Sequence, residues 1–259
     1  MFKAYDFVYD NISSLSQNVK LLYLDNVGFS SSIGSSEKEY RMIKGYNSSR
    51  WKMNGVTMAN PFSFEVQILF HNKVKSSFIK RNQVHIINKW LFNKTNFKRL
   101  QIIQEGLENL YFMAVFKTPE ILYSNGEIIG YKTTVLCDNT GAYEDRRLEK
   151  NCFNQMSFKE ICSHDGVFEI FPTYKIQANS SEFSIQINDV EMSFQNISIG
   201  SNITIDTQTL IVKSDTDNLF VGGKFNLVFP TMVDGENEFK LSGNIKLIVE
   251  YSLIKEVGS

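Results

Sequence analysis

The sequence predicts a mainly β protein, a β-rich α+β chain in which an N-terminal domain with one helix precedes an antiparallel β-sandwich. Apolar and polar residues alternate at a period of two along most of the chain, as they do in half-buried strands. Only the segment at about residues 78–92 has the three- and four-residue apolar spacing of an amphipathic helix. From about residue 165 onward, turn residues separate short alternating segments every ~8–12 residues, which is typical of sandwiches.

The composition indicates a folded protein with a buried core. The chain has 259 residues, of which 42% are hydrophobic and 13% aromatic, enough for one large domain or two of ordinary size. Its 27 basic and 28 acidic residues give a formal net charge of -1. Such a balance gives no broad positive field for tight binding of nucleic acid, although nucleic acid could still pass along such a surface.

Two segments stand out in the N-terminal domain, which is predicted at residues 1–135. Residues 60–70, NPFSFEVQILF, predict a strand, because Phe62, Phe64 and Val66 share one face at a period of two. Residues 28–58 are polar and rich in glycine and serine. This segment is long for a loop, so we expect a hairpin arm or a flexible excursion there.

The single predicted helix has one apolar face. Its apolar residues form two neighbouring rows, which are Ile79, Ile86 and Trp90 in the first and Val84, Ile87 and Leu91 in the second. Ser77 is the expected N-cap. Two strands, KRLQII and LYFMAVF, are expected to follow, joined around Gly106.

The C-terminal domain, predicted at residues 136–259, is expected to be an antiparallel sandwich of jelly-roll or galectin-like type. Its predicted strands include PTYKIQA, FSIQI, VEMSF, KFNLVFP and NIKLIVEY. Each strand places alternate residues on one face. In KFNLVFP these residues are Phe225, Leu227 and Phe229.

The sequence contains no motif that indicates an enzyme. There is no Gly-x-Ser-x-Gly elbow and no glycine-rich phosphate loop. A glycosidase needs only two carboxylates placed by the fold, and nothing in the sequence singles out such a pair. The histidines and cysteines also lack zinc-site spacing. We therefore expect no catalytic residue, metal ligand or cofactor, and ordinary side chains at Cys137, Cys152, Cys162, His71, His85 and His164.

Two loops carry closely spaced carboxylates. Asp215 and Asp217 form one pair, and Asp234 and Glu236 form the other. Carboxylates close together in a loop can bind one calcium ion. A solvated turn is the alternative interpretation of each loop.

The first residues, MFKAYDFVYDNISSL, lack the continuous apolar run and the cleavage site of a signal peptide. No window reaches the ~18 consecutive apolar residues of a membrane span. We therefore expect synthesis in a cytoplasm and no membrane insertion.

Several stretches, in order along nearly the whole chain, resemble the distal tail proteins of long-tailed bacteriophages. YDFVYDNISSLSQNVKLLYLD is similar to the family's first strands, and NPFSFEVQILF to the strand before its helix. INKWLFNKTNFKRLQI resembles the family's helix, loop and strand, and GYKTTVLCDNTGAYED the entry to its C-terminal domain. IGSNITIDTQTLIVKS and FNLVFPTMVDGENEFKLSGNIKLIVEY resemble its last hairpin and its ending. The sequence departs in local turns, since CDNTGAY lacks the Ser-Pro often found after the cysteine.

The resemblance implies a structural hub at the tip or baseplate of a phage tail, and therefore a location in the virion tail after synthesis in the bacterial host. In this family the N-terminal domains form a hexameric ring around a central channel, and the galectin-like sandwiches project outward. The ring joins the tail tube protein to the tail-associated or tip protein. It often carries receptor-binding proteins, and DNA passes through it without specific binding.

The residues we select as candidates for the ring core or the subunit interface are Trp51, Trp90, Leu91 and Phe92. Trp90 could anchor the core of its own domain or a subunit contact, since tryptophan is common in both places. The alternative function is a lectin-like sandwich that binds carbohydrate on the host cell surface. Neither tryptophan lies in the sandwich region, which disfavours an aromatic platform for sugars.

Overall fold

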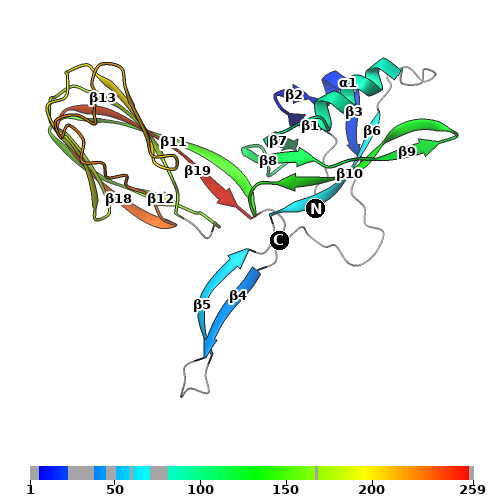
Figure 1. Cartoon of the computed structure of the whole chain (residues 1–259), viewed down its shortest axis with the longest axis horizontal. Helices are drawn as coiled ribbons and strands as arrows, with labels where there is room; N and C mark the ends of the chain where they lie inside the picture. Colours follow the sequence, from blue (N-terminus) through cyan, green and yellow to red (C-terminus); the bar gives the residue numbers. More distant parts are fainter. Residues whose placement is uncertain are drawn as a thin grey trace. The chain divides into compact units, whose positions relative to one another are not determined.

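The computed structural model describes residues 6–22, 38–44, 51–58, 61–70, 81–166 and 169–256. Within these residues the chain is mainly β, with antiparallel sheets and one α-helix, which confirms the predicted fold class (Figure 1). The chain divides into two compact units, unit 1 (Met1–Tyr143 with Lys255–Ser259) and unit 2 (Glu144–Ile254). No described helix is long and apolar enough to cross a membrane.

Unit 1 is built on one antiparallel sheet. Its strands are β1 (Asp6–Tyr9), β2 (Ile12–Ser13), β3 (Val19–Leu22), β6 (Ser63–Phe70), β7 (Lys98–Ile103), β8 (Leu110–Phe116), β9 (Glu120–Ser124) and β10 (Glu127–Cys137). A short 3-10 helix, η1 (Ser14–Gln17), follows β2. The sheet has the order β2-β1-β7-β8-β10-β6-β3, and β9 pairs with β10. The strands predicted at NPFSFEVQILF, KRLQII and LYFMAVF are therefore confirmed as β6, β7 and β8.

β10 organises the sheet because it has three partners. One edge pairs with β6, while the other pairs first with β9 and then with β8. Gly130 is required where β10 approaches β6, because a Cβ at this position would lie 2.2 Å from the backbone oxygen of Ile68. Asn125 and Gly126, with φ of 49° and 80°, form the two-residue turn between β9 and β10.

A second, smaller sheet lies within the polar segment at residues 28–58. It consists of β4 (Lys38–Lys44) and β5 (Trp51–Met58), which pair in antiparallel fashion. Neither strand pairs with the large sheets of the described chain. The expected hairpin arm is therefore present in these two strands, and residues 28–37 and 45–50 lie outside the described part.

The predicted helix is confirmed as α1 (Arg81–Leu91). Three features predicted near it lie outside the described residues, namely its start at residue 78, the N-cap Ser77 and His71. Ile87, Trp90 and Leu91 are buried in the core of unit 1. The prediction was wrong for Ile86, which is 52% exposed. Successive helical residues lie about 100° apart, so Ile86 falls at the rim of a buried face that is narrower than the two predicted rows.

Unit 2 is an antiparallel sandwich of two sheets, as the sequence predicts. Its strands are β11 (Ala142–Cys152, which begins in unit 1), β12 (Gln155–Cys162), β13 (Thr173–Ala178), β14 (Phe183–Ile187), β15 (Val190–Phe194), β16 (Asn202–Asp206), β17 (Ile211–Ser214), β18 (Gly235–Ser242) and β19 (Ile245–Lys255). One sheet has the order β17-β16-β13-β19-β11, and the other has the order β12-β18-β14-β15. Alternate residues of these strands are buried, which places one face of each sheet in the core.

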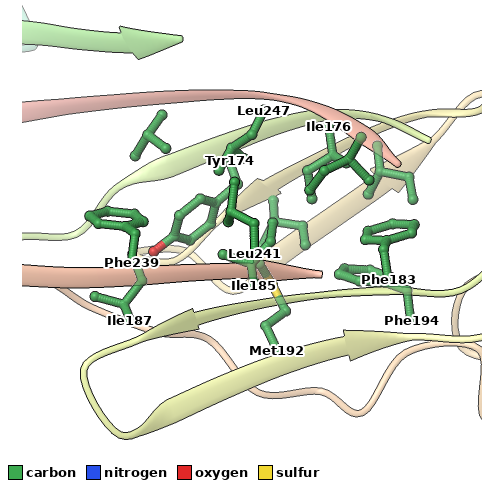
Figure 2. Packing of buried hydrophobic residues seen from close by; sticks show 14 of the residues in the cluster. Tyr174, Ile176, Phe183, Ile185, Ile187, Met192, Phe194, Phe239, Leu241 and Leu247 are labelled. Atoms are coloured by element: carbon green, nitrogen blue, oxygen red, sulfur yellow. The ribbon is translucent and has the colours of Figure 1, made fainter. Parts of the chain in front are cut away.

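The core of unit 2 lies between the two sheets. Figure 2 shows Tyr174 and Ile176 of β13 near Ile185 of β14 and Leu241 of β18, and these four residues are at most 3% exposed. The hydroxyl of Tyr174 donates a hydrogen bond to the backbone oxygen of Pro230 at 2.8 Å. This bond removes the cost of burying an unpaired hydroxyl in an apolar core.

The prediction of a strand at KFNLVFP was wrong. Residues 224–230 contain one isolated bridge, between Phe225 and Phe194, and Leu227 is 54% exposed with a φ of 58°. A positive φ interrupts the extended backbone of a strand. The Phe225 ring still stacks on Phe194 with centroids 4.9 Å apart, and the backbone of Ser193 accepts a bond from Asn226. The segment therefore covers the outer edge of β15.

Candidate assembly surfaces

Trp90 lies in the core of unit 1 and is 5% exposed. Its indole Nε1 donates a hydrogen bond to the backbone oxygen of Tyr9 at 2.9 Å. Its ring stacks on Phe7, with centroids 5.6 Å apart and an interplanar angle of 3°. The bond satisfies the one polar atom of a ring that otherwise makes apolar contacts. In the single chain, Trp90 therefore anchors the core of its own domain.

Leu91 and Phe92 continue the same packing. Leu91 is fully buried, and Phe92 packs edge-on against Phe116 and Tyr131, with centroids 6.3 Å and 5.2 Å apart. Trp51 belongs to β5 of the separate hairpin, and its side chain lies outside the described part. The structure therefore brings three of the four candidate residues together in one core.

The three cysteines are buried thiols. Burial raises the pKa of Cys137 to about 12 and also raises the pKa of Cys152 and of Cys162. A thiol with a raised pKa holds little thiolate at neutral pH, and the thiolate is both the nucleophile and the metal ligand. Within the described residues, no group of three or more His, Cys, Asp or Glu side chains could hold a metal ion.

His164 and one of the two acidic loops make structural hydrogen bonds in unit 2. The Nδ1 atom of His164 accepts a bond from the backbone N–H of Ile254 at 3.0 Å. Its backbone N–H donates to Asp234 Oδ1 at 2.7 Å, while Glu236 forms an ion pair with Lys159 at 2.7 Å. These bonds fix the end of β19 and the start of β18.

Asp217 closes the other acidic loop. Its carboxylate accepts bonds from Ser198 N at 2.9 Å, from Ser198 Oγ at 3.1 Å and from Lys224 Nζ. The hydrogen bond from Lys224 lowers the pKa of Asp217 to about 2. Asp215 accepts from the backbone and side-chain nitrogens of Asn202 at 2.9 Å and 2.7 Å. Both carboxylates thus accept hydrogen bonds from neighbouring groups of the sandwich, which favours the turn over the calcium site.

Both outer faces of the sandwich carry paired charges. On one face Lys175 contacts Glu250 at 2.5 Å, and on the other Lys159 contacts Glu236 at 2.7 Å. The exposed aromatic residues in the described part of unit 2 are Phe153, Phe171 and Phe220. None of the three belongs to a strand. The described sheet faces therefore carry paired charges and no aromatic platform, although Ile161 of β12 is 76% exposed.

Unit 1 exposes apolar residues on the hairpin formed by β9 and the start of β10. Ile121, Tyr123 and Ile129 are 41%, 61% and 38% exposed. Figure 1 shows the β9 end of this hairpin extending beyond the rest of the unit 1 sheet. In the described chain β9 pairs only with β10, so its outer edge offers unpaired backbone groups.

The sequence interpretation missed this hairpin. The signal was present, because Asn125-Gly126 stands between two segments rich in apolar residues, EILYS and EIIGY. Asn-Gly in that position is the strongest short-range indication of a two-residue hairpin.

Comparison with protein families decides the class of protein. The family model described as "Phage tail protein N-terminal domain" matches residues 2–139, and "Phage tail C-terminal domain" matches residues 142–251. The chain belongs to this family of phage tail proteins. The class implied by the sequence resemblance is thereby confirmed. No curated protein matches the sequence.

The fold of the phage tail protein is similar to that of solved tail hub and baseplate structures. The crystal structure of the Dit protein (gp 19.1) of phage SPP1, described as a paradigm of the hub adsorption apparatus in phages that infect Gram-positive bacteria, matches with a TM-score of 0.63 and 9% identity. The match covers 97% of this chain and 100% of that chain. Chains of the phage P2 baseplate in its activated conformation match with TM-scores of 0.54 (with Ca) and 0.53 (with Sr).

Both baseplate matches have 10% identity. They cover 96% and 95% of this chain, and 98% and 97% of those chains. At identities this low the similarity establishes the fold. It extends over both units of the phage tail protein.

Proposed function

We propose that this phage tail protein is a structural hub at the tip or baseplate of the tail, where six copies form a ring. The observation that carries the proposal is the extent of the fold similarity, since a hub protein is matched over 97% of this chain and 100% of its own. The family match to phage tail proteins supports the same role from sequence. The high-pKa thiols and the hydrogen-bonded carboxylates agree with a structural protein rather than an enzyme.

In the proposed ring, the N-terminal domain (residues 1–135) surrounds a central channel and the sandwich (residues 136–259) projects outward. One face of the ring binds the tail tube protein, and the other binds the tail-associated or tip protein. Receptor-binding proteins attach at the rim. DNA passes through the channel, and the formal net charge of -1 suits this role because a strongly basic wall would retain the phosphate backbone.

The candidate residues receive different roles in this proposal. Trp90, Leu91 and Phe92 hold α1 against the sheet and so give the ring domain a rigid core. Trp51, which lies on the β4–β5 hairpin, is proposed as a residue of the subunit interface. A rigid domain is needed for a ring, because small errors in the angle between subunits would prevent closure.

Carbohydrate binding by the sandwich has less support. Sugar sites commonly use an exposed aromatic side chain beside polar groups, and the exposed aromatics of the described unit 2 residues lie outside its strands. A screen of the purified protein against a glycan array measures this alternative directly. Specific binding in the array would support carbohydrate binding as a function of the protein.

Negative-stain imaging of the main size-exclusion peak tests the proposed ring. The expected particle is a sixfold ring with a central hole, or two such rings back to back. Single-chain particles at every concentration, and also after addition of the tail tube and tail-tip proteins, would contradict the proposal.

A further inference from the structure

We propose that the tip of the β9–β10 hairpin of one subunit docks on the exposed face of α1 in the next subunit. The hairpin tip is residues 120–129, and the helix face is Arg81, His85, Ile86 and Lys89. This contact presupposes the hexameric ring and specifies which surfaces of the chain would join its neighbours.

The hairpin tip has the properties of a surface that becomes covered. Ile121 and Tyr123 of β9 are 41% and 61% exposed, and Ile129 of β10 is 38% exposed. The β9 strand adds a free edge of backbone donors and acceptors, because it pairs only with β10 within the described residues. An exposed apolar edge strand is an aggregation hazard, which proteins usually blunt with charge or cover with another element. The α1 helix of the same chain leaves this tip exposed.

The hairpin tip is acidic. Residues 120–129 read EILYSNGEII, with Glu120 and Glu127 and no basic residue, which gives a formal charge of -2. Both carboxylates belong to exposed residues, Glu120 at the base of the hairpin and Glu127 beside its turn. Glu120 begins β9, and Glu127 pairs in register with Ser124 beside the turn. Since side chains alternate along a strand, both carboxylates lie on one face of the hairpin, and Ile121 and Tyr123 lie on the other. The register partner of Glu120 is Lys132, whose Nζ forms an ion pair with Glu65 at 3.2 Å.

The helix face is basic. Residues 81–91 read RNQVHIINKWL, with Arg81 and Lys89 and no acidic residue, which gives a formal charge of +2 with His85 neutral. At about 100° per residue, Arg81, His85 and Lys89 fall within about 80° of one another on the side away from the buried Ile87. Ile86, 52% exposed, lies next to Lys89 at the rim of this face. The helix face thus offers two cations and an apolar side chain.

The acidic face of the hairpin tip and the basic face of the helix complement each other in charge. Within the described residues none of Glu120, Glu127, Arg81 and Lys89 belongs to an ion pair, although many charges of the sandwich faces are paired. Charge complementarity favours docking and fixes its orientation. Because the surfaces differ, the contact is head-to-tail, and a contact of this type repeats from copy to copy until a ring closes. A second copy of this chain is therefore the occupant we assign.

Charge reversal tests the contact. The first variant carries Glu120→Lys and Glu127→Lys, so its hairpin tip and helix face are both basic. The second carries Arg81→Glu and Lys89→Glu, so both surfaces are acidic. Light scattering at a series of protein concentrations should show that each variant alone dissociates at a concentration at least about tenfold higher than the wild type, because each of its contacts joins like charges.

Mixing the two variants gives the decisive result. In an alternating ring every basic hairpin tip meets an acidic helix face, and every acidic hairpin tip meets a basic helix face. The equimolar mixture should therefore recover the hexamer, with the two variants present in equal amounts by native mass spectrometry. Hexamer loss in each variant without recovery on mixing would overturn the contact, since it would indicate damage to the fold.

A matched control separates this contact from net charge. The variant Glu105→Lys with Glu191→Lys changes the formal charge by the same amount at exposed residues outside both surfaces, and it should keep the wild-type mass. Circular dichroism should show equal folding for all variants. If the reversed variants form hexamers as stable as the wild type, the contact is wrong while the ring stands. If the wild type itself stays monomeric with its tail partners present, the proposed ring and this contact both fail.

Discussion

The sandwich of unit 2 and the projecting hairpin of unit 1 differ in how many charged groups on their surfaces are paired. In the sandwich, cross-strand ion pairs lie on both outer faces, beside the 76% exposed Ile161 of β12, and residues 224–226 cover the edge of β15. The hairpin tip leaves an edge strand, apolar side chains and two carboxylates exposed. We infer that the sandwich is complete as a single chain, whereas the ring domain becomes complete only when copies of it assemble.

The largest expected effect concerns the core of unit 1. Trp90→Ala removes a buried ring and its bond to Tyr9, and should lower the free energy of unfolding of unit 1 by about 3–5 kcal/mol. Differential scanning calorimetry should show this loss in one transition, while the transition of the sandwich keeps its temperature.

Trp90→Phe is the matched control, because it keeps an aromatic ring beside Phe7 and loses only the indole bond. It should lose less stability than Trp90→Ala. Equal shifts of all transitions in both variants would contradict the independence of the two units.

A smaller effect is expected at the base of the hairpin. Gly130→Ala places a Cβ 2.2 Å from the Ile68 backbone oxygen, so β10 and β6 must separate, at a cost of about 3 kcal/mol. Urea unfolding measures the loss. Gly126→Ala is the control in the same hairpin, because it meets no atom within 4 Å and should cost only about 1 kcal/mol for its positive φ. Equal losses of stability in the two variants would show that the close approach of β10 to β6 does not determine the cost of the substitution.

The acidic loop of the sandwich should respond to pH. The pKa of Asp217 falls from an ordinary value of 3.8 to about 2 in the folded protein, so its contribution to stability is fully present above pH 3.8. That contribution should be lost as the pH falls toward about 2. Asp217→Asn should cost about 1.5 kcal/mol at neutral pH and flatten this acid dependence, as measured by urea unfolding at several pH values. If the stability of the variant falls in acid as much as that of the wild type, groups other than Asp217 cause the pH dependence.

The smallest effect is expected on the charged face of the sandwich. Glu250→Gln weakens the ion pair with Lys175 at 2.5 Å and the longer contact with Arg147 at 3.9 Å. All three side chains are partly solvated, so the loss should stay below about 1 kcal/mol in thermal unfolding. A loss of several kcal/mol would mean that this face is not the solvated surface described above.

The period-two pattern predicted the strands of the sandwich well, because each strand has one buried and one solvated face. β13, β14, β15 and β19 all lie where alternation predicted them. The same pattern failed at KFNLVFP, where Leu227 adopts a positive φ and the chain crosses an edge instead of joining the sheet. Alternation alone cannot separate these cases, because the outcome depends on whether a neighbouring strand is available for pairing.

The candidate site was only partly accessible from sequence. Trp90 and Leu91 could be assigned to an apolar helix face, but the extent of burial depends on the width of the sheet beneath, and Ile86 remained half exposed. The hairpin tip was missed although its Asn-Gly turn is a recognised signal. Its exposed surface follows from the fact that no other described element covers it, and local sequence does not encode such tertiary packing.

The mass of the purified wild-type protein, measured by light scattering after size exclusion over a range of concentrations, tests the central claim most directly. A ring domain that completes its surface by self-assembly predicts a species of six times the 29.8 kDa of one chain, which dissociates as the protein is diluted. A mass of 29.8 kDa at every concentration, with or without the tail tube and tail-tip proteins, would contradict it.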